Sequence, residues 1–166
     1  MHEKNGEHPF GDTGQLLSLV VFLTVWAGDS FLLHLSTFLS DCIPLSFRLA
    51  VFALTLIAAT YLLKSGHAAV SREERPTRLI VTGAFRYVRH PLYLASILTY
   101  LGLSISTASL LALAASVGIF VFHNYIANYE EELLEAKFEE EYRNYKRRTG
   151  KWMPKPAKEP RTGKSK

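Results

Sequence analysis

The chain has 166 residues, of which 48% are hydrophobic and 20% are charged, and its formal net charge is +4. This length is typical of a single domain, and the single cysteine, Cys42, excludes an internal disulfide bond. The positive charges flank long uncharged stretches, so we attribute them to membrane topology and lipid headgroups and expect no nucleic-acid partner.

The uncharged stretches predict four transmembrane helices. A helix that crosses a bilayer needs about 20 apolar residues. The spans are expected at about 14–39, 45–63, 91–105 and 107–127. The last two share one uncharged stretch, which as a straight helix would reach about 54 Å and must therefore turn, near 104–106. The fold class is all-α: a polytopic membrane protein of about four transmembrane helices with a C-terminal helix extension.

Two ionisable residues, Asp29 and His34, lie within the first predicted span or near its outer end. Such residues are costly at membrane depth, which makes both of them functional candidates. The alternative for Asp29 is a structural position, because Gly28 precedes it and the helix can bend there. The short link at 40–44 indicates that the first two helices are antiparallel.

The basic residues are concentrated in two segments that indicate the topology. Six of the 19 lysines and arginines lie between Lys64 and Arg89, and eleven lie from Lys137 onward. The positive-inside rule places both segments in the cytoplasm. Four spans give the same result, with both termini and the 64–90 loop on the cytoplasmic side.

The polar segments are expected to connect or follow the membrane domain without adding another one. The segment 65–81 has no apolar period and is interpreted as an exposed loop. Residues 1–154 are expected to form a single membrane domain. The basic tail at 155–166 contains prolines and is expected to be disordered.

The segment 128–148 contains no helix breaker and is expected to continue the fourth helix out of the membrane as a cytoplasmic extension. Its inner face is formed by Leu134, Phe138, Tyr142 and Tyr145. At about 100° per residue, Glu130 and Glu131 flank this face, while Glu132 points nearly opposite. An ordinary solvated acidic turn is the alternative interpretation.

The most informative stretch, residues 82–96, lies between the two apolar halves. Pro91 is suited to the first position of a helix, which places His90 at or near the N-cap. The free N–H groups and the positive dipole end of that helix favour an anionic group. The stretch therefore predicts a site for an anionic or zwitterionic small molecule where an apolar span meets water.

Antiparallel packing of the third and fourth spans brings this helix start close to residues 127–131. His90, Tyr93, Glu130 and Glu131 can then line one pocket. Their carboxylates can accept hydrogen bonds from an ammonium group or from ribose hydroxyls, while the helix start and a nearby arginine can hold a carboxylate. S-adenosylmethionine carries all of these groups together.

Two motifs carry a resemblance that extends over roughly residues 70–154. They are Gly83-Ala-Phe-Arg-Tyr-Val-Arg-His-Pro-Leu-Tyr93 and Glu130-Glu-Glu-Leu-Leu-Glu-Ala-Lys-Phe138-Glu-Glu-Glu-Tyr142-Arg-Asn-Tyr145. The chain resembles the isoprenylcysteine carboxyl methyltransferase and phospholipid methyltransferase family, whose members are integral membrane enzymes that use S-adenosylmethionine.

The resemblance implies roles for individual side chains. The cofactor-binding residues would be Tyr87, His90, Tyr93, Glu130 and Glu131. Arg89 and Glu131 would act in catalysis. The substrate-binding residues would be Arg147, Arg148 and Trp152. No metal is implied.

The expected acceptor is a lipid or lipidated carboxylate, because the motif resembles that of the carboxyl methyltransferases more closely and Arg89, Arg147 and Arg148 can hold an anion. A carboxylate is already ionised at pH 7 and needs no base. A phospholipid amine would instead need a glutamate or histidine as a base. Membrane sterol reductases that use NADPH share a related Arg-His-Pro motif. They usually have Asn before the motif tyrosine, where this chain has Leu92. A non-catalytic membrane scaffold, with His90 as a helix cap and the glutamates as arginine partners, is the last alternative.

Overall fold

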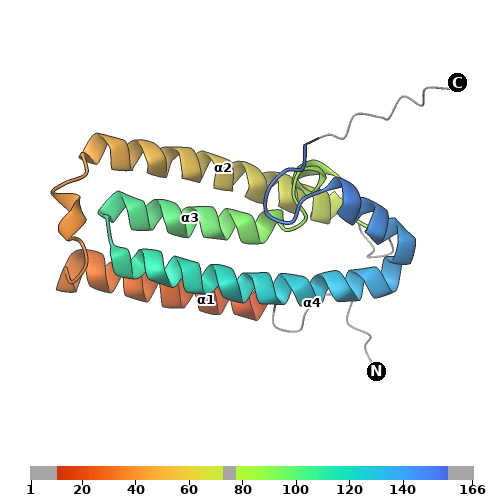
Figure 1. The fold of residues 1–166 in the computed structure, drawn as a ribbon, viewed down its shortest axis with the longest axis horizontal. Helices are drawn as coiled ribbons and strands as arrows, with labels where there is room; N and C mark the ends of the chain where they lie inside the picture. Colours follow the sequence, from red (N-terminus) through yellow and green to blue (C-terminus); the bar gives the residue numbers. More distant parts are fainter. Residues whose placement is uncertain (1–10, 73–77, 157–166) are drawn as a thin grey trace, which may run out of the picture.

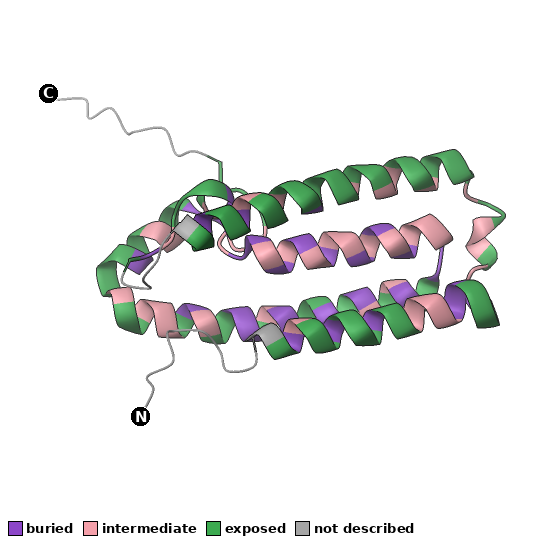
Figure 2. Cartoon of the chain, turned by 180° about the vertical axis from the view of Figure 1, so that it is seen from behind, coloured by how far each residue is buried: buried purple, intermediate pink, exposed green. Residues whose placement is uncertain are grey.

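The computed structural model describes residues 11–72 and 78–156, and within them the protein is a bundle of helices without a strand. The main helices are α1 (Gly11–Ala27), α2 (Leu45–Arg72), α3 (Pro91–Thr107) and α4 (Leu110–Arg148). In Figure 1, α3 runs between α2 and the pair formed by α1 and α4. Buried residues gather along α3, whereas α2 is largely exposed (Figure 2). The prediction of an all-α fold is confirmed.

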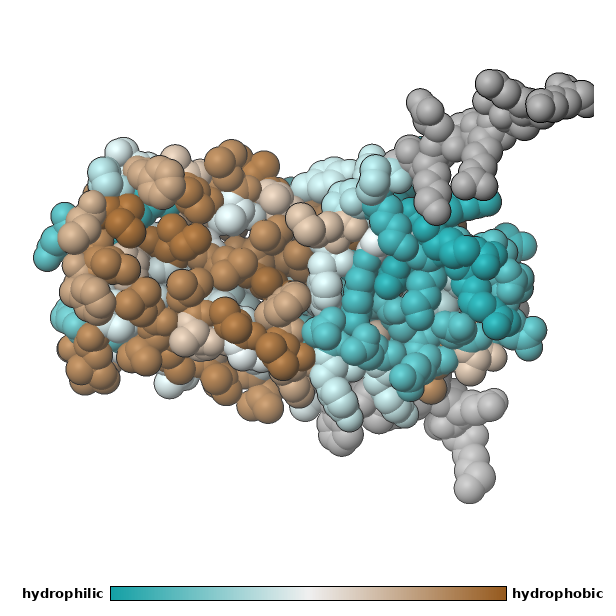
Figure 3. Space-filling model, viewed as in Figure 1, coloured by the Kyte–Doolittle hydropathy of each residue, from teal (hydrophilic) through white to brown (hydrophobic). Residues whose placement is uncertain are grey.

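Three helices in the described part of the chain are long and apolar enough to cross a membrane, at Thr13–Leu33, Leu45–Ser71 and Leu110–Arg148. Apolar side chains cover one long section of the surface, and hydrophilic ones cover the end formed by the 78–90 loop and the C-terminal part of α4 (Figure 3). Exposed apolar surface on this scale marks contact with a bilayer. The 17 residues of α3 reach only about 25 Å, so the predicted third span at 91–105, and with it the total of four spans, remains a prediction.

Helix boundaries differ from the sequence prediction at both ends of the first link. The first helix continues as a π-helical segment, η1 (Gly28–Leu33), and ends where His34 adopts a left-handed conformation with φ 51°. A short 3-10 helix, η2 (Phe38–Ser40), then leads to α2. The second helix runs to Arg72 instead of residue 63, because Lys64 ends the apolar span but favours helix. Much of the expected 65–81 loop is therefore helical.

Asp29 is only 2% exposed and fixes the end of the bundle that lies far from the 78–90 loop. Its carboxylate accepts hydrogen bonds from the backbone N–H of Ser36 at 3.0 Å, and from the hydroxyls of Ser36 and Ser109, both at 2.5 Å. Ser109 is also the N-cap of α4, accepting from the N–H of Ala112. Asp29 therefore joins η1 to the start of α4, while His34 is exposed.

The turn between α3 and α4 lies at Ala108 and Ser109, later than the predicted 104–106. Ala108 takes the left-handed conformation that ends α3, with φ 55°. Gly102 lies inside α3 and has a packing role. A Cβ atom at Gly102 would lie 2.2 Å from the hydroxyl oxygen of Thr55, so the glycine lets α2 and α3 approach closely.

The expectation of an unbroken helix over 128–148 is wrong at Glu139, where φ is 44° and the helix bends. A non-glycine residue in such a conformation costs about 1–3 kcal/mol. The segment beyond the bend packs on the 78–90 loop, where Tyr142 is 1% exposed and the hydroxyl of Tyr145 donates to the carbonyl of Phe85 at 2.7 Å. These contacts offset the strain and keep both tyrosines inward. Most of the predicted tail at 155–166 lies outside the described residues.

Candidate active site

Side chains from the start of α3 and from α4 form one network of hydrogen bonds and close polar contacts at the boundary between the apolar and hydrophilic sections of the surface. Its members are Arg89, His90, Tyr93, Glu130 and Glu131. The antiparallel course of α3 and α4 brings residues about forty positions apart into contact (Figure 1). The sequence prediction that these residues come together is therefore confirmed.

Arg89 and Glu131 form a buried, two-point ion pair, with side chains 8% and 6% exposed. The guanidinium donates from Nε to Oε1 at 2.9 Å and from Nη2 to Oε2 at 3.2 Å. Its remaining nitrogen, Nη1, donates to the carbonyl of Thr149 at 2.5 Å. Burial alone would raise the pKa of Glu131, but the hydrogen bond to His90 and the charge of Arg89 outweigh it and hold that pKa at about 2.

His90 is the N-cap residue of α3, with Pro91 at the first helical position, as the sequence predicts. Its Nε2 lies 3.2 Å from Oε1 of Glu131, and its Nδ1 lies 3.6 Å from Oε2 of Glu130. A carboxylate can only accept, so Nε2 carries the proton that is shared with Glu131. The ring thus links the two glutamates at the start of the helix.

Glu130 is the more accessible of the two glutamates, with a side chain that is 18% exposed. The Tyr93 hydroxyl donates to its Oε1 at 2.5 Å. The neighbouring Glu132 is exposed, which confirms the predicted orientation of the three carboxylates. Because Glu131 is enclosed by Arg89 and His90, Glu130 presents the carboxylate that a ligand can reach most easily.

The segment after α4 covers this network. Trp152 lies with its ring centroid 5.8 Å from that of His90, and its Nε1 donates to the side chain of Asn124 at 3.0 Å. Lys151 donates to the same oxygen at 2.9 Å, and burial lowers the pKa of this lysine. The backbone N–H of Arg89 donates to the carbonyl of Gly150 at 2.9 Å, which fixes the segment to the 78–90 loop.

The other residues suggested by the sequence lie outside this network. Tyr87 is 48% exposed on the surface of the loop. Arg147, with a side chain 64% exposed, pairs with Glu140 at 2.8 Å, and Arg148 is exposed. Of the expected substrate-binding residues, Trp152 is the one that contacts the network.

One buried polar side chain beside the network, His123, was missed by the sequence prediction. His123 is 0% exposed and its ring centroid lies 5.0 Å from that of Tyr93. Neither nitrogen of His123 has a hydrogen-bond partner among the described residues, and the same holds for the hydroxyl of Tyr142. The available signal for His123 was its spacing, seven residues before Glu130 and hence on the same face of α4.

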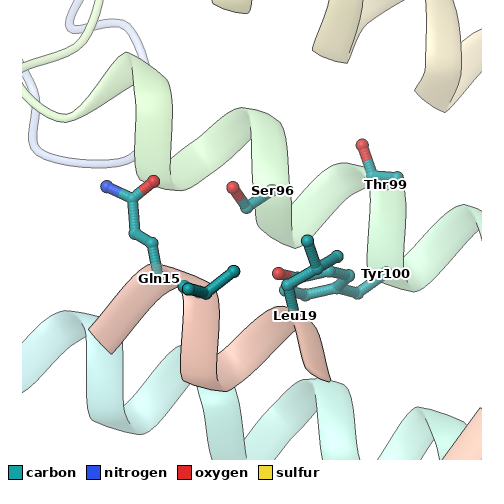
Figure 4. Close-up of a pocket in the computed structure, with 6 residues that line it drawn as sticks. Gln15, Leu19, Ser96, Thr99 and Tyr100 are labelled. Atoms are coloured by element: carbon teal, nitrogen blue, oxygen red, sulfur yellow. The ribbon is translucent and has the colours of Figure 1, made fainter. Parts of the chain in front are cut away.

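A cavity of about 360 Å3 lies between α1 and α3, further into the apolar section (Figure 4). Its lining combines leucines with polar groups: Gln15, Leu16, Leu19, Ser96, Thr99 and Tyr100. Ser96 follows Tyr93 by three residues on α3, so the cavity begins about one helical turn from the network. The network residues themselves do not line this cavity.

Two comparisons with known proteins found similar sequences. The profile of the phospholipid methyltransferase family matches residues 45–141, which is more than half of the chain. The chain is also 35% identical over 85 residues to methanethiol S-methyltransferase 1 of Bradyrhizobium diazoefficiens. That alignment covers 51% of this chain and 29% of the relative, so the chain spans less than a third of the relative's length. No solved structure matches.

Proposed function

Because the chain belongs to the phospholipid methyltransferase family, a family of membrane methyltransferases, we propose that it uses S-adenosylmethionine to methylate an acceptor taken from the bilayer. The observation that carries the proposal is the buried network of Arg89, His90, Tyr93, Glu130 and Glu131 at the end of an apolar bundle. A merely structural ion pair does not need a second, partly exposed glutamate held by a tyrosine beside it.

The residues around the network fit the chemical groups of S-adenosylmethionine. The partly exposed carboxylate of Glu130 suits an ammonium group or the ribose hydroxyls. The start of α3 suits a carboxylate, and the ring of Trp152 suits the face of an adenine. The buried hydroxyl of Tyr142, which has no hydrogen-bond partner among the described residues, also suits a polar ligand. When bound, the cofactor supplies an electrophilic methyl group.

Arg89 and Glu131 act mainly by positioning in this proposal. All three nitrogens of the guanidinium already donate to protein oxygens, so Arg89 holds Glu131 and the carbonyl of Thr149 in place. Glu131 in turn orients the ring of His90. The side chains left to contact ligands are those of His90, Tyr93 and Glu130. This division refines the catalytic roles expected for Arg89 and Glu131.

The acceptor is proposed to enter sideways from the membrane. The site lies at the proposed cytoplasmic end of the spans, with both termini on that side. Tyr87, Arg147 and Arg148 are exposed at this end and can meet the polar part of a lipid or lipidated substrate. Because each nitrogen of the Arg89 guanidinium already donates to a protein oxygen, a carboxylate acceptor would depend more on Arg147 or Arg148. A phospholipid amine and a thiol, the latter suggested by the name of the relative, are the other candidate acceptor classes.

Titration calorimetry of the detergent-solubilised protein with S-adenosylmethionine tests the proposal. The wild type is expected to bind, and Glu130→Gln is expected to weaken binding about tenfold, because a hydrogen bond to a charged group contributes about 1.5–3 kcal/mol. Glu132→Gln, which changes an exposed neighbour in the same way, is the matched control and should bind as the wild type does. Binding of NADPH instead would favour a reductase, and binding of neither would favour a scaffold.

Mass spectrometry after incubation with isotopically labelled cofactor identifies the acceptor class. The samples should include membrane lipids, prenylcysteine compounds and alkanethiols. A labelled methyl group on any of them, absent with Tyr93→Phe and Glu130→Gln combined, supports the transferase. Absence of label on every sample, despite cofactor binding, would contradict transfer to these acceptors.

A further inference from the structure

His123 is a polar residue that the network does not use. Its side chain is 0% exposed, and neither ring nitrogen has a hydrogen-bond partner among the described residues. The groups known to pack against it are the rings of Tyr93 and Phe122, with centroids at 5.0 and 6.0 Å. An imidazole in this setting therefore has an unpaired donor and an unpaired acceptor.

Stability alone does not account for a histidine at this position. A buried polar group without a partner destabilises the folded state, and a phenylalanine would fill similar space without that penalty. An ionisable residue within a membrane helix is also expensive and marks a functional site. His123 is therefore explained best by a polar group that is part of a ligand.

The position of His123 shows which ligand it can meet. It lies two helical turns before Glu130 on the same face of α4, about 10.5 Å deeper in the apolar section. We call the level of Glu130 the outer level and that of His123 the inner level. Tyr93 connects them, because its hydroxyl donates to Glu130 while its ring contacts His123. The cofactor groups proposed above belong to the outer level. The inner level is where an acceptor that arrives from the bilayer would present its nucleophile.

The cavity between α1 and α3 lies near this inner level, although His123 does not line it. Ser96 in its lining is one turn from Tyr93 on α3. On the other wall, Gln15 follows Gly14, where a Cβ atom would lie 3.4 Å from the ring of Phe122, the neighbour of His123. The cavity and His123 thus belong to the same layer of the bundle, and the cavity can accommodate a short alkyl chain.

We propose that His123 binds the methyl acceptor and takes its proton, and that this acceptor is an uncharged alkyl thiol. The proposal rests on the proposed methyltransferase function. The imidazole nitrogen accepts a hydrogen bond from the S–H group. The S–C bond to the incoming methyl forms as the C–S bond of the sulfonium donor breaks and leaves its electron pair on the donor's sulfur. The thiol proton passes to the ring of His123.

This step moves a positive charge without creating one. The donor carries one positive charge before transfer, and the imidazolium carries it afterwards, so the buried site keeps the same net charge. The other acceptor classes fit this site less well. A carboxylate has no proton to give and needs a cation, whereas the rings of Tyr93 and Phe122 offer none. An ammonium group would have to lose its hydration and its proton in an apolar layer.

The test uses the full chain in lipid nanodiscs with 1-octanethiol, octanoate and octylamine as acceptors. His123→Phe is expected to lower kcat for octanethiol at least 100-fold, because positioned bases contribute about 10²–10⁴-fold. His123→Gln, which can form hydrogen bonds but cannot take the proton, should show a similar loss. His67→Phe, at an exposed position of α2, is the matched control and should leave kcat unchanged.

Two readouts besides activity separate this role from a structural one. The Tm of His123→Phe should equal or exceed that of the wild type, because the unpaired ring is removed without leaving a cavity. Its Kd for S-adenosylmethionine should stay within twofold. Octanethiol should raise the Tm of the wild type but leave that of His123→Phe unchanged.

Each contrary result overturns a distinct part of the proposal. Full octanethiol activity in His123→Phe, or rescue by His123→Gln, would remove His123 as the proton acceptor. A large loss of cofactor affinity in His123→Phe would place the residue in the cofactor site. Methylation of octanoate or octylamine but not octanethiol would overturn the thiol class while leaving the proposed function intact. A wild type that binds no S-adenosylmethionine would overturn both.

Discussion

The two ends of the bundle each bury a carboxylate, but they treat it differently. At one end, Asp29 is 2% exposed and accepts hydrogen bonds from Ser36 and Ser109, which carry no charge. At the other, Glu131 is 5% exposed and pairs with Arg89 and His90. The hydrogen bonds of Asp29 connect η1 to α4. The contacts around Glu131 extend further, through His90 to Glu130, whose side chain is partly exposed.

This difference separates a structural polar cluster from a site. Hydroxyls and a backbone N–H can satisfy a carboxylate, and nothing in the Asp29 cluster then remains for a ligand. The network at the start of α3 contains groups that can change charge or partner, and it lies under the ring of Trp152. Both ends bury a charged residue. The network at the start of α3 is the one with polar groups that a ligand can reach.

The largest effect should come from removing the cation of the network. Arg89→Ala leaves the carboxylate of Glu131 buried without its charge partner and should reduce the free energy of unfolding by about 3–5 kcal/mol. It should also abolish methyl transfer, because the segment at Thr149 and Gly150 loses its anchor. Thermal unfolding and labelled-methyl assays measure the two effects. If Arg89→Ala kept the free energy of unfolding of the wild type, the ion pair between Arg89 and Glu131 would contribute little to stability.

Acid should weaken the end of the bundle that contains Glu131. The pKa of Glu131 is lowered to about 2 from its ordinary value of 4.5. Because the folded-state pKa is depressed, the stabilisation is present above about pH 4.5 and is lost as the pH falls toward 2. The loss should be on the order of 3 kcal/mol. Unfolding at a series of pH values, with Glu131→Gln as the control, should show a flatter acid limb in the variant.

Asp29→Asn should affect stability without affecting the cofactor. The amide presents N–H groups to at least one of the donors that the carboxylate satisfied, so the free energy of unfolding should fall by about 1–3 kcal/mol. The Kd for S-adenosylmethionine should not change, since the two ends share no contact. A changed Kd in folded protein would break the distinction between the two ends.

Tyr93→Phe should give the smallest effect, confined to binding. The change removes the hydroxyl that donates to Glu130 and keeps the ring that contacts His123. Cofactor affinity should fall about fivefold, the size expected for one hydrogen bond of about 1 kcal/mol. Ser109→Ala, which removes one hydroxyl from Asp29 at the other end, is the control for calorimetry. Equal losses of affinity in the two variants would contradict the assignment.

The sequence was sufficient for those parts of the site that depend on local rules. Pro91 predicted the helix start and His90 its N-cap, and the rotation of about 100° per residue turned Glu131 inward and Glu132 outward. The antiparallel pairing of two apolar segments then brought Tyr93 close to Glu130. Each step needed only periodicity and a short turn.

The remaining features depend on tertiary contacts that no local pattern contains. The bend at Glu139 has no glycine or proline, and it exists because Tyr142 and Tyr145 pack on a distant loop. The sequence also does not reveal that the carbonyl of Thr149 and the carboxylate of Glu131 both accept hydrogen bonds from Arg89. Only the folded structure shows which hydrogen-bond donors already have an acceptor.

The contact between the 78–90 loop and the segment after α4 also orders the biogenesis of the site. Arg89 and His90 are synthesised about sixty residues before Thr149 and Gly150, which bond to Arg89. At a translation rate of about 5–20 residues per second, the half-site at α3 stays open for several seconds. Glu131 is made about forty residues after Arg89, so their ion pair can form before the bonds to Thr149 and Gly150. The contacts of Arg89 are complete only when residues 149 and 150 have been made, after the membrane helices.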